Sequence, residues 1–187
     1  MDQTVQTDRL VLRPLQDEDE TPWIRMEEAS DALFRPWMPR LEEGTTWRDL
    51  FLHTLSHASR AEAEDTGLVR IAVPIASPDE IVGVFSLSQI FRRAFQNAYA
   101  GWRVSALHQG EGFATESMRA MLDLAFGSLG LHRVQANVIP TNHASLRVAH
   151  KIGMRREGYA ERYLQIDGTW QDHVMFARTS DEHRPRG

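Results

Sequence analysis

Three successive strand-like segments in the middle of this chain constrain its fold more than any other feature. They cover residues 68–75, 81–90 and 97–104, and a polar turn at 77–80 separates the first two. Consecutive strands pair through short connections, and helices alternate with strands only after residue 112. The pattern therefore predicts an α/β protein of the α+β kind, with a mixed sheet in place of a doubly wound parallel one.

Hydrophobic spacing predicts the remaining elements on both sides of this block. Period-two segments indicate strands, and apolar residues at spacings of three and four indicate helices. The expected strands cover residues 10–14, 134–138, 159–166 and 169–177, and the expected helices cover 17–30, 45–61, 112–129 and 142–151. Pro36 and Pro39 predict an irregular aromatic loop, and Asp167-Gly168 predicts a tight hairpin turn.

The composition predicts one domain and excludes several classes of protein. The chain has 187 residues, enough for one sizeable core, and we expect loosely ordered tails at 1–6 and 179–187. The absence of cysteine excludes disulfides, cysteine metal sites and a thiol nucleophile, so no metal is expected. A net charge of −5 argues against nucleic-acid binding. No membrane-spanning segment or signal peptide is evident, so a cytoplasmic location is expected.

A glycine-containing turn, HQGEGFATES at residues 108–117, lies between a predicted strand and a long predicted helix. Glycines let a backbone approach a ligand closely, and the start of a helix favours phosphate. A P-loop requires a Lys-Ser/Thr pair after its second glycine, and no such pair follows Gly112. A dinucleotide fingerprint requires three glycines, and only Gly110 and Gly112 are available. A nucleotide-binding module is therefore disfavoured, whereas an ordinary helix start with small packing residues remains an alternative.

Several further strings occur in a particular order along nearly the whole chain. They are TDRLVLRPL, IVGVFSLSQIFRRAFQNAYAGWRV, HQGEGFATES, PTNHAS followed by KIGMRREGYA, and YLQIDGTWQDHV. Together they resemble the GNAT-superfamily N-acetyltransferases, and most of all the RimJ/RimL type that acetylates ribosomal-protein alanine or serine N-termini. The resemblance implies the GNAT fold, a mixed and mostly antiparallel sheet flanked by helices.

The same resemblance implies acetyl-CoA as co-substrate and places its pyrophosphate at the glycine turn. The strand at 99–104 should separate from the strand at 134–137 and expose backbone groups to the pantetheine. The implied cofactor-binding residues are Trp102, Arg103, Val104, Gln109, Gly110, Glu111, Gly112, Phe113, Ala114, Thr115, Asn137, Asn142 and Ser145.

Catalytic roles follow from the resemblance less directly. Ser145 matches the serine proposed to protonate the CoA thiolate, and Asn142 lies on the same helix face but also suits a helix N-cap. The expected position of the general base carries Leu164, which leaves Glu161, Asp172 or His173 nearby. An α-amine has a pKa near ~7.7–8.0, against ~10.4 for lysine, so a water chain could replace a base.

The acceptor is expected to be the N-terminal α-amine of a protein such as a ribosomal protein, attacked directly in a ternary complex. Candidate pocket residues are Trp37, Tyr99 and Tyr163, with Phe34, Trp102 and Trp170 as further aromatics, although any of them could belong to the core. Acidic residues that could attract a basic peptide, or simply face solvent, are Glu42, Glu43, Asp167 and Asp172. Acetylation of a small amine (a polyamine, amino sugar or peptide antibiotic) and a non-catalytic acyl-CoA-binding module remain alternatives, and a homodimer is left open.

Overall fold

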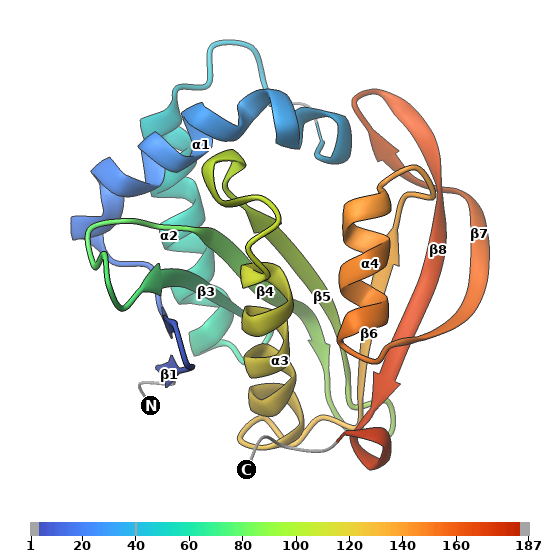
Figure 1. Cartoon of the computed structure of the whole chain (residues 1–187). Helices are drawn as coiled ribbons and strands as arrows, with labels where there is room; N and C mark the ends of the chain where they lie inside the picture. The colour runs from blue at the N-terminus through green and yellow to red at the C-terminus, as the bar shows by residue number, and fades with distance from the viewer. Residues whose placement is uncertain (1–3, 40, 184–187) are drawn as a thin grey trace.

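The fold is built on one eight-stranded sheet, seen in Figure 1. The computed structural model describes residues 4–39 and 41–183. The sheet order is β1-β2-β3-β4-β5-β6-β8-β7, and only β5 and β6 among these neighbours run parallel. The strands are β1 (Val5–Gln6), β2 (Leu10–Arg13), β3 (Gly67–Pro74), β4 (Gly83–Phe91), β5 (Asn97–Val104), β6 (Arg133–Val138), β7 (Arg155–Ile166) and β8 (Thr169–Thr179). The predicted mixed, mostly antiparallel sheet is therefore confirmed.

Four α-helices flank the sheet. They are α1 (Glu20–Phe34), α2 (Trp47–Ala63), α3 (Phe113–Phe126) and α4 (His143–Lys151). Short 3-10 helices cover Asp17–Asp19, Arg35–Trp37, Ala106–His108 and Ser180–Glu182. In Figure 1, α3 and α4 lie side by side on one face of the sheet, whereas α2 lies behind β3 on the other face.

Each face of the sheet has its own hydrophobic core. Met118 and Met121 of α3 are fully buried in the larger core, against residues of the central strands and of α4. Trp23 of α1 and Phe51 of α2 meet edge to face at 5.6 Å in the smaller core, which packs on β3 and β4. The sheet is therefore held from both sides, and the helices fix the positions of the strands that bound the site.

Local sequence signals set several of these elements. Thr46 caps α2 by accepting from the Asp49 amide, and the Asp49 carboxylate accepts from the Thr46 backbone in return. Asp167 and Gly168 join β7 to β8 with φ values of 46° and 76°. Both residues of such a two-residue turn need positive φ, which explains the Asp-Gly pair.

Some boundaries differ from the prediction. The first helix continues to Phe34, so a 3-10 turn at Arg35–Trp37 replaces most of the expected aromatic loop. The helix after the glycine turn ends at Phe126. Strand β7 begins at Arg155, four residues before the expected start, because it is an edge strand whose mostly exposed side chains lack an alternating apolar pattern.

Parts of both segments expected to be loose tails form regular structure. Val5 and Gln6 pair with Leu12 and Val11, and Ser180–Glu182 forms a 3-10 helix after β8. The rest of the predicted tails, residues 1–3 and 184–187, lies outside the described residues.

The loop after β1 is tied to the start of α3. The Glu116 carboxylate accepts hydrogen bonds from the Thr7 hydroxyl at 2.6 Å and the Arg9 amide at 3.1 Å, and it pairs with the Arg9 guanidinium at 2.6 Å. Burial opposes ionisation of this carboxyl, but these hydrogen bonds outweigh it and hold the pKa of Glu116 below its usual value. The contact fixes where α3 begins.

We expect Glu116→Gln to destabilise the protein in a pH-dependent way. Because the folded-state pKa is lowered, the stabilisation is present at neutral pH and is lost as pH falls through that pKa. The Arg9 side chain is 48% exposed, so the loss at pH 7 should be only about 1 kcal/mol. Urea unfolding at pH 7 and below pH ~4 measures it. Glu43→Gln, at an exposed position, is the control, and an equal loss at both pH values would contradict the assignment.

Candidate functional site

Strands β5 and β6 separate after a short stretch of pairing. Asn97, Ala98 and Tyr99 of β5 pair with residues 133–135 of β6, and no pairing continues beyond Tyr99 in the described part of the chain. Both strands extend further, to Val104 and Val138. The predicted separation is therefore confirmed, and the facing edges of two strands carry backbone groups that no strand satisfies.

The glycine turn lies beside this opening and begins helix α3. Gly110 and Gly112 have φ values of 83° and 86°, in the left-handed region that favours glycine. Gly112 is the N-cap residue and supplies no side-chain cap, so the first amides of α3 keep their donors for a ligand. The Gln109 side chain instead donates to the Val104 and Ser105 carbonyls, at 2.7 and 3.0 Å, and braces the turn against β5.

The other turn residues predicted to bind the cofactor lie in two kinds of place. Some contact the neighbouring Arg9 side chain, and others line a cavity or a groove. Phe113 is buried beneath the Arg9 guanidinium, which lies 4.5 Å from the ring centroid. The Glu111 carbonyl accepts from Arg9 at 3.0 Å. Ala114 lines the cavity beside β5, and Thr115 faces a groove on the outer side of α3.

Two adjoining cavities occupy the opening. One, of about 320 Å³, lies between the 3-10 turn after α1, strand β5 and the starts of α3 and α4. The other, of about 200 Å³, lies between β5 and β6. Both are lined by Trp37, Gly101, Trp102, Asn142 and Ser145. The Trp102 indole N–H is buried and has no hydrogen-bond partner among the described residues.

Asn142 caps the helix that carries Ser145, and both residues line the two cavities. The Asn142 side-chain oxygen accepts from the Ser145 amide at 3.0 Å and caps α4, which confirms the N-cap interpretation. The same bond fixes the first turn of α4, and Ser145 lines both cavities.

Arg103 makes a contact that the sequence did not indicate. Its guanidinium pairs with Glu27 of α1 at 2.5 Å, and the Glu27 side chain is only 5% exposed. Burial raises the pKa of Glu27, and Arg103 opposes that rise. The pair joins α1 to β5, so the Arg103 side chain is occupied at the wall of the larger cavity.

A polar cluster lies at the other end of the opening. The Asn137 side-chain amide donates to the Tyr163 hydroxyl at 3.0 Å, and Asn137 lines the smaller cavity. Burial, followed by the neighbouring Tyr99 hydroxyl, raises the pKa of Tyr163. His173 is buried beside it, with ring centroids 5.3 Å apart, and hydrogen-bonds the Gln171 carbonyl through Nδ1.

The other base candidates do not join this cluster. Glu161 is exposed on β7 and lines neither cavity. The Asp172 carboxylate accepts from the Arg162 amide at 2.8 Å and from the Tyr159 hydroxyl at 2.7 Å. Those two bonds lower the pKa of Asp172 and hold an irregularity in β7.

A third cleft, of about 620 Å³, continues from the larger cavity past Phe34, Met38 and Arg103. Asp167, at the tip of the β7–β8 hairpin, lines it opposite Glu27 and Asp31 of α1. Of the predicted aromatics, Trp37, Trp102 and the buried Phe34 line the larger cavity. Tyr99 and Tyr163 line none of these spaces, and Trp170 is 59% exposed. Glu42 and Glu43 are exposed and line none of these spaces.

Residues 4–39 and 41–183 contain no group of three or more His, Asp or Glu side chains that could hold a metal ion. Within the same ranges, every helix lacks the combination of length and apolar character that a membrane span requires.

The comparisons with known proteins agree with this geometry. A family described as an acetyltransferase (GNAT) domain matches residues 9–155. The "[Ribosomal protein uS5]-alanine N-acetyltransferase" of Escherichia coli (strain K12) is 29% identical over 96% of this chain and 92% of its own length. "Probable N-acetyltransferase YjcK" of Bacillus subtilis (strain 168) is 43% identical over 54% of this chain, and this match spans only 56% of that relative. The structure of Mycobacterium smegmatis RimJ in complex with CoA-disulfide superposes with a TM-score of 0.83 at 29% identity, covering 92% of this chain and 83% of that one.

Removing the α4 cap should destabilise the protein measurably. Asn142→Ala deletes the acceptor of the Ser145 amide, and we expect a loss of about 1 kcal/mol in the free energy of unfolding. Asn142→Asp keeps a capping oxygen and should lose much less. Denaturant unfolding of both variants tests this, and equal stability of the alanine variant and the wild type would contradict the capping role.

Proposed function

Because this chain belongs to the GNAT acetyltransferase family, we propose that it transfers an acetyl group from acetyl-CoA to the N-terminal α-amine of a protein, with a ribosomal protein as the expected class of acceptor. The observation that carries the proposal is the full-length similarity to a ribosomal-protein alanine N-acetyltransferase. It supports the resemblance to RimJ/RimL enzymes found in the sequence. The cytoplasmic location and the direct reaction in a ternary complex belong to the same proposal.

The residues present fit acetyl-CoA. The left-handed Gly110 and Gly112 and the open start of α3 suit a pyrophosphate. The unpaired edge of β5 beyond Tyr99, with Trp102, Arg103 and Val104, would hydrogen-bond the pantetheine through its backbone. A groove lined by Gly112, Thr115 and Lys151 also carries Arg9 and Arg119 beside Glu116 and Asp123. Its basic side chains suit the phosphate of acetyl-CoA that lies outside the pyrophosphate.

Within this site, the bound thioester supplies the activated acetyl group. The neutral acceptor amine would attack the thioester carbon, and its lone pair would form the new N–C bond. The C–S electron pair would leave with the sulfur as the CoA thiolate, and the amine would give up one proton to water. Backbone amides on the free edge of β5 would stabilise the charge on the carbonyl oxygen. Ser145 is the residue that we assign to protonate the departing CoA thiolate, because it lines both cavities. Its hydroxyl would recover a proton from the water that took one from the amine.

The acceptor would enter through the cleft between α1 and the β7–β8 hairpin. This cleft shares lining residues with the larger cavity. Its acids Glu27 and Asp31 are paired with Arg103 and Arg35, so Asp167 is the carboxylate that favours a cationic peptide end. A protein α-amine is partly neutral at pH 7, so it needs less help from a base than a lysine side chain does. This matches a site in which Glu161 lies outside both cavities.

Acetyl-CoA binding is tested at Gly112. We expect Gly112→Val to lower the affinity for acetyl-CoA at least about tenfold, because a β-branched side chain disfavours the left-handed backbone that presents the α3 amides. Isothermal titration calorimetry measures this. Gly130→Val is the matched control, since Gly130 also has a positive φ of 60° but lies in the turn after α3. Unchanged affinity in the Gly112 variant would contradict the assignment.

The acceptor class is tested with a panel of amines. Short peptides with N-terminal alanine or serine should be acetylated faster than three other kinds of acceptor. These are the same peptides with an acetylated N-terminus and an internal lysine, a polyamine, and an amino sugar. Release of CoA with time measures the rate, and mass spectrometry locates the acetyl group. Preference for a small amine would replace the proposed acceptor. Tight acetyl-CoA binding without turnover on any amine would indicate a binding module instead.

A further inference from the structure

The chain carries a single lysine, Lys151, which is the last residue of helix α4. Of its 21 lysine and arginine residues, every other one is arginine. A guanidinium stays protonated, so it does not attack acyl groups. Lys151 is exposed, and its amine has no hydrogen bond or ion pair within residues 4–39 and 41–183. Its Nζ is therefore the one side-chain amine of this chain that an acyl donor can modify.

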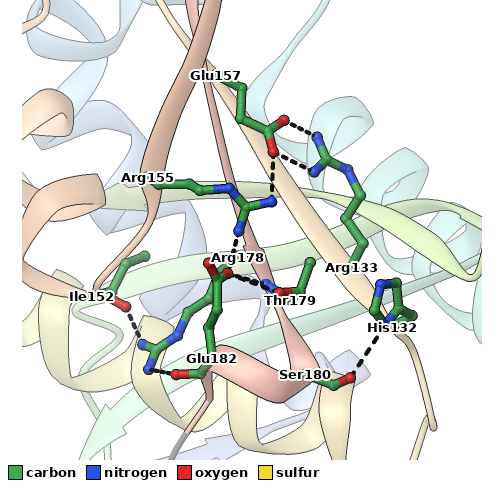
Figure 2. Close-up of polar contacts among 9 residues, drawn as sticks. All are labelled: His132, Arg133, Ile152, Arg155, Glu157, Arg178, Thr179, Ser180 and Glu182. Atoms are coloured by element: carbon green, nitrogen blue, oxygen red, sulfur yellow. Dashed lines mark hydrogen bonds and ion pairs between the residues drawn. The ribbon is translucent and has the colours of Figure 1, made fainter.

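Two arginines line the groove on the outer side of α3 together with Lys151. Arg119 of α3 donates to the Lys151 carbonyl at 3.0 Å. Arg178 of β8 donates to the carbonyl of the next residue, Ile152, and to the Glu182 carbonyl at 3.0 Å, as Figure 2 shows. Both guanidiniums are thus held beside Lys151 by uncharged backbone carbonyls. No carboxylate of the described residues pairs with either of them, so their charges remain available to an anion.

The acidic residues that line the same groove do not cancel these charges. Glu116 is paired with Arg9 at 2.6 Å, and the Asp123 carboxylate contacts the His183 ring at 2.7 Å. Asp8 is exposed to solvent. Even with Asp8 and Asp123 each counted as one negative charge, the lysine and the two arginines leave an excess of positive charge. Such an excess attracts small anions and raises their local concentration.

Lys151 lies too far from the proposed reaction centre to receive the acetyl group of bound acetyl-CoA. Ser145, which would face the thioester, precedes Lys151 by six residues on α4. That separation is about 9 Å along the helix axis. A bound cofactor would instead place its outer phosphate in the groove and cover Lys151. An acyl donor that reaches Lys151 must therefore be a separate molecule, which binds while the cofactor is absent.

We propose that Lys151 is a modification site, at which a small acyl phosphate held by Arg119 and Arg178 transfers its acyl group to Nζ. The neutral amine attacks the carbonyl carbon, and its lone pair forms the new N–C bond. The C–O bond to the phosphate breaks, its electron pair leaves on the phosphate, and the amine gives up one proton to water.

The modification removes a charge from the groove. The amide that forms at Lys151 is uncharged, so one cation that would contact the outer phosphate of acetyl-CoA is lost. Acylation of Lys151 therefore weakens cofactor binding, and bound cofactor in turn protects Lys151 from acylation. This regulatory consequence rests on the proposed function, because it requires acetyl-CoA to occupy the groove.

The modification itself is read by mass, with acetyl phosphate as the probe. Peptide mapping by mass spectrometry separates acetylation at Lys151 from acetylation of the amino terminus. We expect Arg119→Gln to slow acetylation of Lys151 about fivefold, because the variant lacks one of the two charges that hold the phosphate. With p-nitrophenyl acetate, a donor without charge, the variant and the wild type should react at the same rate.

The matched control is Arg147→Gln. Arg147 is an exposed arginine of α4 that does not line the groove, so this variant should react like the wild type with both donors. Equal rates for Arg119→Gln and the wild type with acetyl phosphate would overturn the site. An equal slowing of Arg119→Gln with both donors would overturn the phosphate contact.

The effect on cofactor binding is measured by isothermal titration calorimetry before and after treatment with acetyl phosphate. We expect wild-type protein acetylated at Lys151 to bind acetyl-CoA about fivefold more weakly, as for a lost exposed ion pair. Lys151→Arg keeps the charge but has no amine to acylate, so its affinity should be the same before and after treatment. An unchanged affinity of the acetylated wild type would overturn the regulatory role.

Protection by the cofactor is tested with desulfo-CoA, which lacks the thiol that acetyl phosphate could acylate. At ten times its Kd it should slow acetylation of Lys151 about tenfold, because about that share of the protein is then occupied. Binding of desulfo-CoA without protection would overturn the overlap of the two sites.

Failure of the proposed function is seen separately, in untreated wild-type protein. Protein that does not bind acetyl-CoA would remove the proposed function and the regulatory role together. Protein that binds and uses acetyl-CoA but gains no acetyl group at Lys151 would overturn the modification alone.

Discussion

The three-residue parallel contact between β5 and β6 is the constraint on which the rest of the site depends. Each strand is held along its full length by its other neighbour, β5 by β4 and β6 by β8. Neither strand can therefore bend to close the gap beyond Tyr99. Buried backbone groups that find no partner are costly, so a fold keeps such an edge where a ligand can satisfy it. The two adjoining cavities occupy this gap.

The two faces of the gap carry different polar groups, because different elements cover them. On one face, the glycine turn and the starts of α3 and α4 gather unsatisfied amides and Ser145. The ties from Thr7 and Arg9 to Glu116 hold the start of α3 in place, and the Asn142 cap does the same for α4. On the other face, the Asn137 side-chain amide donates to the Tyr163 hydroxyl. In the proposed function, acetyl-CoA would bind on the first of these faces and the acceptor would approach from the second.

Sequence patterns predicted the features that depend on neighbouring residues. The start of the second helix near Thr46, the Asp167-Gly168 turn and the glycine turn are local, so their residue types carry the information. The start of β7 was missed because the first residues of this edge strand are polar and held by ion pairs such as Arg133–Glu157. Contacts across long separations, such as Arg103 with Glu27, left no periodic signal and could not be anticipated.

The irregularity in β7 explains why the acceptor side was the hardest part to predict. Ala160 pairs with His173 and Leu164 with Gln171, so three residues of β7 oppose one residue of β8. Arg162 takes a positive φ of 49°, and its amide is held by Asp172. Such an insertion changes which side chains face the sheet. It leaves Glu161 exposed and brings Tyr163 to Asn137, so counting residues from the hairpin turn could not locate either side chain. Asp172, expected at the substrate, instead holds the backbone of the irregularity next to Tyr163 by accepting from the Arg162 amide.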